Sequence, residues 1–312
     1  MNWKHIVVAG GGVLGSQIAF QSAYSGYDVT IWLRSEASIE RARPKLERLK
    51  AIYLDTLEKM KTDPRAYARG LSDRTDLSDE EIDLLKEYVE EAYRHLHLTT
   101  SYEDAFSNAD FVIETIAEDP EQKIVFYKEA SKYLKDEAIL ATNSSTMLPS
   151  TFAPYTNRAD KYLALHFANE IWRNNTAEVM GHEGTDQKAY DQVVEFAKSI
   201  HMVPLCLKKE QPGYILNSML VPFLSAAEML LATGVADAKT IDQTWMLGTG
   251  APAGPFRILD IVGLTTAYNI VIMHPDAKNP ETVQGKIANM LKSYIDEGKT
   301  GINAGEGFYK YK

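Results

Sequence analysis

The stretch that decides the fold is residues 5–20, HIVVAGGGVLGSQIAF. Its apolar start predicts a short buried strand, and its end has the pattern of a helix. Between them lie three glycines in the arrangement G-x-G-x-x-G, namely Gly10, Gly12 and Gly15. In this arrangement the first glycine permits a tight turn, the second lets a pyrophosphate approach the backbone, and the third lets helix and strand pack closely. A second apolar strand follows at residues 28–32, so the whole segment predicts a dinucleotide-binding site.

The residues that follow the second strand indicate which nicotinamide cofactor is bound. A unit that binds NAD usually has an acidic residue there, which bonds the ribose hydroxyls. This chain has Leu33 near that position, followed by Arg34 and Ser35. An arginine and a hydroxyl can hold a 2′-phosphate through charge-assisted hydrogen bonds, which favours NADP(H). NAD(H) is the alternative, with Arg34 on the surface and Glu36 providing the ribose contact from a shifted loop.

A helical and highly charged segment, residues 38–97, interrupts the alternation of strands and helices. Apolar residues recur at steps of three and four within residues 45–61. Ser78 and Glu81 form a capping box, which predicts the start of a second helix. We therefore expect a helical excursion, and two roles are open for it: a solvated hairpin or a flap over the substrate.

Three apolar runs in the following part of the chain carry or lead into polar and titratable residues. The first run is followed by Asn143, Ser144 and Ser145, the second by His166, and the third contains Glu178. An open α/β sheet places the carboxyl ends of its strands in the ligand crevice, so these side chains should lie close together. A hydroxyl, an imidazole and a carboxylate that meet there suit proton transfer.

Two further charged residues, Glu118 and Lys123, flank the junction between a strand and the following helix. They either contact the cofactor or the substrate, or they are solvated charges at the start of the helix. Strands and helices that alternate in this way predict a Rossmann-like, doubly wound and mostly parallel sheet. After the breaker KKEQPG, residues 208–213, the pattern is almost entirely helical. We therefore expect a dinucleotide-binding domain of residues 1–209 and an all-α domain of residues 210–312.

The composition excludes several classes of protein. The chain has 312 residues, 45% hydrophobic and 24% charged, which is ordinary for a globular protein with a substantial core. A formal charge of −10 without a basic stripe argues against a nucleic-acid partner. No apolar run approaches the ~18 residues that span a bilayer, and the single cysteine, Cys206, cannot form an internal disulfide. We expect a cytoplasmic protein without a metal site and without a membrane partner.

The motifs together resemble those of the L-3-hydroxyacyl-CoA dehydrogenase family over nearly the whole chain. They are, in order, the glycine pattern, NSS at Asn143–Ser145, HFAN at His166–Asn169, AEV around Glu178, PGYILN at Pro212–Asn217, GPFRILDIVGL at Gly254–Leu264 and the final GEGFYKYK. Within the family the chain is most similar to the diketoreductase branch, through segments such as VLGSQIAFQ and NNTAEVMG. The resemblance implies a homodimer formed through the helical domain, and a nicotinamide-dependent oxidation or reduction at C3 of an acyl chain.

The resemblance also implies roles for individual residues. His166 is the general acid and base, and Glu178 is its partner. Ser145 and Asn217 fall on positions that contact the substrate oxygen. The residues expected to contact the cofactor are Glu118, Lys123, Asn143 and Asn169, in addition to the three glycines, Arg34 and Ser35. Trp245, in the helical domain, is expected either to line the mouth of the substrate site or to pack in the core.

Two departures from the family pattern leave the substrate open. The usual HFFNPVP is HFANEIWRNN here, at residues 166–175, and the excursion carries no clear counterpart of the serine and lysine that contact coenzyme A. A short-chain 3-hydroxyacyl-CoA, such as 3-hydroxybutyryl-CoA, is the first candidate. A free 3-oxo or 3,5-dioxo ester or acid is the second. A third interpretation is a dinucleotide-binding protein without turnover, which the joint presence of the four predicted catalytic residues argues against.

Overall fold

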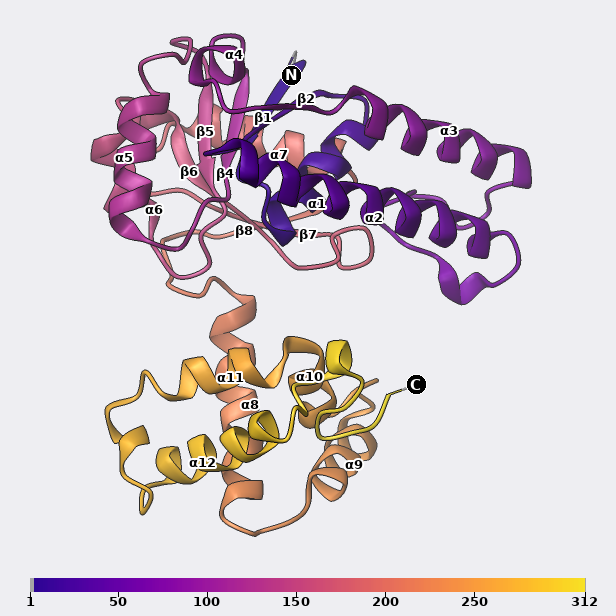
Figure 1. The fold of residues 1–312 in the computed structure, drawn as a ribbon, viewed down its shortest axis with the longest axis vertical. Coiled ribbons are helices and arrows are strands. Elements are labelled where there is room, and N and C mark those ends of the chain that lie inside the picture. The colour runs from indigo at the N-terminus through magenta and orange to yellow at the C-terminus, as the bar shows by residue number, and fades with distance from the viewer. Residues whose placement is uncertain (1–2, 312) are drawn as a thin grey trace. The chain divides into compact units, whose positions relative to one another are not determined.

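The computed structural model describes residues 3–311 of the chain. The chain divides into two compact units, Met1–Ile215 and Leu216–Lys312. Figure 1 shows a sheet with its helices in the first unit and an assembly of helices in the second. The division follows Ile215, whereas the breaker in the sequence suggested a boundary near residue 209. A mostly parallel sheet followed by helices confirms the predicted fold class.

The first unit is built on a sheet whose described residues form eight strands in the order β3-β2-β1-β4-β5-β6-β7-β8. Neighbouring strands run parallel except for the β6–β7 pair, which is antiparallel. The strand order reverses between β1 and β4, and this is the point where open α/β sheets bind their ligands. The strands are β1 (His5–Ala9), β2 (Asp28–Trp32), β3 (His97–Thr99), β4 (Phe111–Glu114), β5 (Ile139–Thr142), β6 (Tyr162–Phe167), β7 (Thr176–Met180) and β8 (Val203–Cys206).

The central strands are mostly apolar because helices cover both faces of the sheet. In β1, Ile6 belongs to one cluster of buried residues and Val7 belongs to the other. This alternation follows from the period of two that a strand imposes on its side chains. Helix α1 (Val13–Tyr24) packs into the first cluster and helix α5 (Pro120–Ala130) into the second. Covering on both faces explains why these strands read as continuous apolar runs rather than alternating ones.

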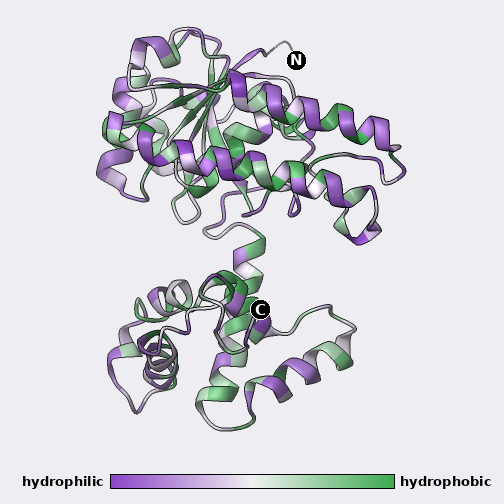
Figure 2. Ribbon diagram, turned by 45° about the vertical axis from the view of Figure 1, so that its right-hand side comes forward, coloured by the Kyte–Doolittle hydropathy of each residue, from purple (hydrophilic) through white to green (hydrophobic). Residues whose placement is uncertain are grey.

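The predicted helical excursion consists of helices α2 (Glu36–Met60) and α3 (Asp79–His95). Figure 1 shows the two helices side by side, projecting away from the sheet. Their apolar faces are buried against α1 and include Tyr53 from α2 and Val89 from α3. Their outer faces are largely hydrophilic in Figure 2. The capping box predicted at the start of α3 is present.

The second unit is all-α. Its main helices are α8 (Leu216–Ala232), α9 (Ala238–Thr249), α10 (Pro255–Val262), α11 (Leu264–Val271) and α12 (Val283–Asp296). They surround a core that includes Phe256 and Leu291. Two buried carboxylates organise this unit: Asp242 accepts the Phe256 N–H at the start of α10 at 2.8 Å, and Asp260 accepts the Phe308 N–H of the C-terminal tail at 2.8 Å. The tail is therefore held against the helical core by a buried acceptor.

Short helices make up most of the remaining regular structure. They are α4 (Tyr102–Phe106), α6 (Pro149–Phe152) and the 3-10 helices η1 (Pro64–Ala66), η2 (Ala153–Tyr155), η3 (Ala159–Lys161), η4 (Pro275–Lys278) and η5 (Ile302–Ala304). Helix α7 (Gln187–Ser199) is longer, with 13 residues. Across residues 3–311, no helix combines the length and the apolar character that crossing a membrane requires.

Candidate active site

The glycine turn after β1 leaves no room for a side chain at two positions and open space at a third. Gly10 has φ +123°, and a Cβ there would lie 2.7 Å from the Thr115 carbonyl oxygen. A Cβ on Gly15 would lie 2.3 Å from the Gly10 carbonyl oxygen, so α1 can start this close to β1 only with glycine. A Cβ on Gly12 would meet no atom within 4 Å. Gly12 is therefore the position where a ligand can approach the backbone, as the pyrophosphate of a dinucleotide requires.

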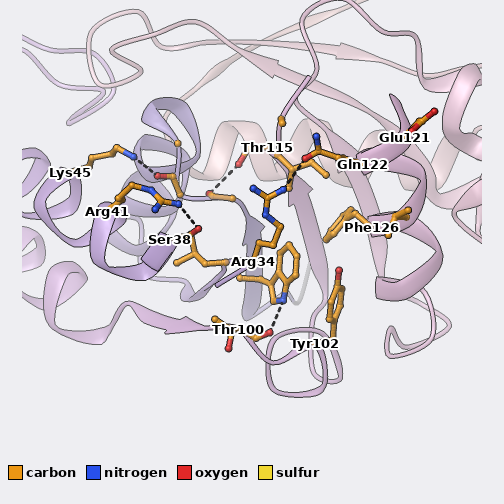
Figure 3. Close-up of a pocket in the computed structure, with 18 residues that line it drawn as sticks. Arg34, Ser38, Arg41, Lys45, Thr100, Tyr102, Thr115, Glu121, Gln122 and Phe126 are labelled. Atoms are coloured by element: carbon orange, nitrogen blue, oxygen red, sulfur yellow. Dashed lines mark hydrogen bonds between the residues drawn. The ribbon is translucent and has the colours of Figure 1, made fainter. Parts of the chain in front are cut away.

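A cavity of about 880 Å³ lies beside this turn, between the ends of β1 and β2 and helix α5, and Figure 3 shows its lining. Leu33 and Arg34 line it at the end of β2, where an NAD-binding unit usually has its acid. Ser35 is absent from its lining, but the Ser35 hydroxyl lies 3.0 Å from the hydroxyl of Ser38, which does line it. An aromatic wall completes the cavity, formed by Trp32, Tyr102 and Phe126.

A smaller cavity of about 280 Å³ joins the glycine turn to the predicted catalytic loop. The predicted site residues that line it are Gly12, Gly15, Glu118, Lys123, Asn143 and Ser145. Asn143 also ties two strand ends together, because its Oδ1 accepts the Phe167 N–H at 3.1 Å. Asn169 lines neither of these cavities and is exposed in the turn after β6. The structure thus gathers most of the predicted cofactor residues around one turn and leaves Asn169 outside that group.

A hydroxyl from the loop after β5, an imidazole near the end of β6 and a carboxylate from the middle of β7 form a hydrogen-bonded series. Ser145 Oγ lies 3.1 Å from His166 Nε2, and His166 Nδ1 lies 3.1 Å from Glu178 Oε2. The antiparallel pairing of β6 with β7 sets His166 directly opposite Glu178. Directly opposed residues of an antiparallel pair project their side chains on the same face, close enough to interact. Both side chains are buried, with 6% of His166 and 3% of Glu178 exposed, so this contact is shielded from water.

The hydrogen bonds around Glu178 define the tautomer of His166. Glu178 Oε1 accepts the N–H of Ile215 at 2.8 Å, while its Oε2 faces the imidazole. An ionised carboxylate only accepts hydrogen bonds, so Nδ1 of His166 carries the proton and donates it to Glu178. In its neutral form the imidazole would therefore present the unprotonated Nε2 toward Ser145.

Glu118 organises the loop that carries the two serines. One of its oxygens accepts the N–H groups of Ser145 and Thr146, each at 3.2 Å, and the Thr146 hydroxyl at 2.8 Å. The other lies 3.4 Å from Lys123 Nζ. Burial raises the pKa of the Glu118 carboxyl, but the hydrogen bonds from Ser144 and Thr146 and the charge of Lys123 outweigh burial, so this pKa lies below its ordinary value. Glu118 is therefore an ionised anchor for the loop.

Glu114, at the end of β4, is a buried partner that the sequence interpretation did not identify. It is fully buried and lies 2.6 Å from the Nζ of Lys123, which is itself only 1% exposed. It also accepts the Thr142 hydroxyl at 2.8 Å. Lys123 thus bridges two carboxylates, Glu114 and Glu118. The sequence feature that could have identified Glu114 is its charge in an otherwise apolar strand, because a buried charge needs a partner.

Tyr214 is a second residue that sequence reasoning missed. Its ring is stacked on the imidazole of His166, with centroids 4.4 Å apart and planes 12° from parallel. Its hydroxyl donates to the Ser144 carbonyl oxygen at 2.7 Å, and only 1% of the side chain is exposed. Burial, followed by nearby carboxylates of which Glu178 has the largest effect, raises the pKa of the Tyr214 phenol, so it stays protonated. No periodicity predicts this contact, because Tyr214 has a φ of +54° and lies outside regular structure.

Two predicted residues belong to the helical unit. Asn217 lies in the first turn of α8. Trp245 lies on α9 and packs against Phe223, with ring centroids 4.5 Å apart, while 39% of it stays exposed. Trp245 therefore has a packing contact, and its role at the mouth of the substrate site stays a prediction.

A dinucleotide turn at the switch point of the sheet, next to a buried imidazole–carboxylate pair, defines the class of a nicotinamide-dependent oxidoreductase. Residues 5–211 match the family model described as 3-hydroxyacyl-CoA dehydrogenase, NAD binding domain, and residues 213–311 match the model of the C-terminal domain. The chain belongs to the 3-hydroxyacyl-CoA dehydrogenase family. It is therefore an oxidoreductase that acts on CH–OH groups with a nicotinamide cofactor.

Similar proteins extend over the whole length of the chain. The mitochondrial hydroxyacyl-coenzyme A dehydrogenase of Homo sapiens is 32% identical over 311 residues, covering 99% of this chain and 91% of that protein. The 3-hydroxybutyryl-CoA dehydrogenase of Clostridioides difficile is 29% identical, covering 98% and 99%. The solved structure of a diketoreductase has a TM-score of 0.86 at 45% identity and covers 100% of both chains. The predicted resemblance to the family and to its diketoreductase branch is confirmed.

Proposed function

We propose that the protein interconverts 3-hydroxyacyl and 3-oxoacyl groups and that its favoured substrate is a short-chain 3-hydroxyacyl-CoA, such as 3-hydroxybutyryl-CoA. The observation that carries the proposal is the hydrogen-bonded series of Ser145, His166 and Glu178. Relatives named 3-hydroxybutyryl-CoA dehydrogenase, which match nearly the whole chain, support the substrate class.

His166 moves the proton in this reaction, at its Nε2. When bound, the nicotinamide supplies or accepts the hydride at C3. In reduction, protonated Nε2 donates its proton to the C3 oxygen as negative charge develops there, and in oxidation neutral Nε2 accepts the proton of the alcohol. Glu178 keeps a proton on Nδ1 and stabilises the imidazolium. The Ser145 hydroxyl, 3.1 Å from Nε2, can donate a hydrogen bond to the same oxygen. Asn217 is proposed as a second donor on the resemblance alone.

Substitution of the imidazole tests this mechanism. We expect His166→Ala to lower kcat by about 10²–10⁴-fold, because general acid–base catalysis contributes that much, while the affinity for the cofactor stays near wild type. His182→Ala is a matched control, since His182 contacts the Ala159 carbonyl oxygen and takes no part in the series. Unchanged turnover in His166→Ala would refute the assignment.

A second candidate is a diketoreductase-like enzyme that acts on free 3-oxo or 3,5-dioxo esters or acids. The diketoreductase structure with 45% identity supports it. The loop after His166 is also anchored to the helical excursion, since Trp172 is buried and its carbonyl oxygen accepts the Gly70 N–H at 2.9 Å. Several cations of the excursion are already paired with carboxylates, for example Lys61 with Asp83 at 2.6 Å. Paired cations are poor anchors for the phosphates of coenzyme A.

The two candidates differ in what they require of the substrate. A nicotinamide absorbance assay should be run with acetoacetyl-CoA and with a free β-keto ester, under the same conditions. A dehydrogenase of acyl-CoA should show a far higher kcat/KM with the thioester, because its binding energy comes largely from the coenzyme. Equal or better turnover of the free ester would instead support the diketoreductase-like reaction.

The cofactor is proposed to be NADP(H) rather than NAD(H). Leu33 cannot bond a ribose hydroxyl through its side chain, and Arg34 lines the cavity beside it. Ser35 is included in this proposal because its hydroxyl contacts that of Ser38, which lines the same cavity. Comparison of kcat/KM with NADPH and NADH tests the preference, and Arg34→Ala should lower only the NADPH value. Equal losses with both cofactors would mean that Arg34 does not recognise the phosphate.

The last part of the proposal concerns partners and location. We propose a homodimer formed through the helical unit, supported by apolar side chains that this unit exposes, such as Leu247 at 87% and Met273 at 74%. Light scattering after size-exclusion chromatography measures the mass directly, and a monomer at micromolar concentration would contradict the proposal. A cytoplasmic location is proposed as well, because the single cysteine, Cys206, has no intramolecular partner.

A further inference from the structure

Three side chains of α2 lie on one face of that helix and line the larger cavity. They are Ser38, Arg41 and Lys45, which follow one another at steps of three and four residues. Residues at these steps are neighbours on the surface of an α-helix. Figure 3 shows Arg41 and Lys45 extending from α2, with Arg34 entering from the end of β2. Arg34 Nη1 donates to Gln122 Oε1 at 3.0 Å, so its guanidinium crosses the cavity toward α5.

The three cations that line the cavity, Arg34, Arg41 and Lys45, have neutral polar partners. Lys45 Nζ donates to the Gly11 carbonyl oxygen at 2.9 Å, which brings its charge to the glycine turn. Arg41 Nη2 donates to Ser38 Oγ at 2.8 Å. Among residues 3–311, no carboxylate forms an ion pair with Arg34, Arg41 or Lys45. Each of them therefore keeps its charge available to an anion.

The cavity is positive within an acidic protein. Among the described residues that line it, Glu121 is the single carboxylate against the three cations, whereas the chain as a whole has a formal charge of −10. Two cations farther along α2 are paired with carboxylates: Lys50 lies 2.6 Å from Glu90, and Lys59 lies 2.7 Å from Asp55. Local positive charge in a low-dielectric cleft concentrates anionic ligands.

The lack of an ion pair does not by itself identify an anion-binding residue. Arg43 also lacks an ion pair within the described chain, but it lines a separate cavity between α2 and α3. What distinguishes Arg41 and Lys45 is that they share a helical face and a cavity with each other, and that Arg41 also contacts the Ser38 hydroxyl. Arg43 is therefore a matched control on the same helix.

We propose that Ser38, Arg41 and Lys45, together with Arg34, form a subsite for a phosphate monoester, namely the 2′-phosphate on the adenosine ribose of NADP(H). The proposal rests on the dinucleotide site of the proposed function and adds to it the face of α2. A phosphate monoester carries about −1.5 to −2 charge at pH 7 and offers three acceptor oxygens. Guanidinium groups and an ammonium match such a group through charge-assisted hydrogen bonds.

NAD(H) has no group that uses this subsite. Its 2′-hydroxyl would call for a carboxylate acceptor, and the position where that acceptor usually stands is Leu33. The cations would then stay without a counter-charge. Lys45, which reaches the glycine turn, could in addition serve the pyrophosphate that both cofactors share. Arg41 is therefore the more selective probe of the 2′-phosphate.

Nucleotide binding without any substrate tests the subsite. The full-length protein should be titrated calorimetrically with 2′,5′-ADP and with 5′-ADP, which differ in the 2′-phosphate. We expect 2′,5′-ADP to bind at least about tenfold more tightly, a gain of the size that one charge-assisted contact provides. Arg41→Ala and Lys45→Gln should each remove most of that gain, Arg41→Lys should restore part of the Arg41 contribution, and Arg43→Ala should leave it unchanged. Higher salt should weaken 2′,5′-ADP more than 5′-ADP.

Equal affinity of the wild-type protein for the two nucleotides would overturn the subsite. So would an equal effect of Arg41→Ala and Arg43→Ala, since that would report only net charge. Thermal melting of each variant separates loss of binding from loss of folding, and Arg41 is exposed, so its removal should not disturb the core. Because no acyl substrate is present, failure of the 3-oxoacyl reaction would leave this result intact. Conversely, an active enzyme that prefers NADH would contradict the subsite and the proposed cofactor, but not the proposed reaction.

Discussion

At the scale of single residues, His166 is oriented by neighbours from three separate segments. Glu178 comes from β7, Ser145 from the loop after β5, and Tyr214 from the segment before α8. The carboxylate decides which nitrogen carries the proton, and the stacked phenol covers one face of the ring. An imidazole held in this way presents Nε2 without having to reorient during the reaction, which is the condition for efficient proton transfer.

Substitutions of Tyr214 should separate its ring from its hydroxyl. Tyr214→Phe keeps the stacked ring and loses only the hydrogen bond to the Ser144 carbonyl oxygen, so we expect kcat/KM to fall by a factor of about two to ten, as loss of about 1 kcal/mol implies. Tyr214→Ala removes the ring as well, and kcat should fall further while KM for the cofactor changes little. The measurement is the pH profile of kcat/KM for the three proteins.

The pH profile distinguishes a positioning role from a merely structural one. Loss of the ring exposes His166 to water, so the pH at which activity changes should move between wild type and Tyr214→Ala but stay in place for Tyr214→Phe. A Tyr214→Ala enzyme with the wild-type kcat and pH profile would show that the stacking has no part in orienting the imidazole.

At the scale of elements, the turn between β1 and α1 offers a paired test at two glycines. Gly12→Ala places a methyl group in open space, so the protein should fold normally, while its affinity for a dinucleotide falls at least about tenfold because the backbone is no longer approachable. Gly15→Ala places a methyl group 2.3 Å from the Gly10 carbonyl oxygen. That variant should lose about 1–3 kcal/mol of stability through overpacking.

Thermal melts and calorimetric titration of both glycine variants check this expectation. The pattern expected is a normal melting temperature with weak binding for Gly12→Ala and a lowered melting temperature for Gly15→Ala. Wild-type affinity in Gly12→Ala would mean that the pyrophosphate does not lie against this part of the backbone.

Helix α8 carries a buried acid whose titration should be visible in stability. Burial raises the pKa of Glu228 from 4.5 to about 7, and its Oε1 has no hydrogen-bond partner among the described residues. The folded protein therefore holds this proton more tightly than the unfolded chain does, so stability falls as the pH rises from about 4.5 and levels off above about 7. Glu228→Gln should be more stable than wild type at pH 8, by at most about 3 kcal/mol.

Urea unfolding at pH 5 and at pH 8 measures the effect of Glu228. The advantage of Glu228→Gln should be present at pH 8 and small at pH 5, where the wild-type acid is largely protonated in the folded state. A difference that does not depend on pH would show that Glu228 finds a partner when it ionises. Glu297→Gln is a control, because Glu297 is exposed beyond the end of α12.

At the scale of the whole molecule, the division after Ile215 predicts that the first unit folds by itself. It has its own core on both faces of the sheet and contains the glycine turn and the series from Ser145 to Glu178. Residues 1–215 expressed alone should therefore bind a dinucleotide with nearly the affinity of the full chain. The fragment should show little or no turnover, because it lacks Asn217 and the rest of the helical unit.

Circular dichroism and nucleotide titration of this fragment provide the measurement. A folded fragment that binds the dinucleotide and does not turn over would support both the proposed domain organisation and the proposed role for the helical unit. Full activity of residues 1–215 would contradict the assignment of a catalytic role to Asn217. The reciprocal fragment, residues 216–312, should not bind nucleotide.

Much of the fold was predictable because it is encoded by local patterns. Period-two and continuous apolar runs identified the central strands, and spacings of three and four identified α2 and α3. The capping box at Ser78 marked the start of α3 to the residue. The division between the units was less well marked, since breakers such as KKEQPG precede the first turn of α8 by several residues.

The sequence by itself determined the glycine turn, the order of strands and helices, and the residue types that follow the strands, because each depends on neighbours a few positions away. Only the tertiary structure decided which of those side chains meet. The register of β6 with β7 sets His166 opposite Glu178, and the positive φ of Tyr214 brings its ring onto the imidazole. Arg41 and Arg43 are two positions apart on α2, so they lie on different faces of the helix, and Arg41 lines the cavity whereas Arg43 does not. Such convergence depends on pairing between distant segments, which no local pattern encodes.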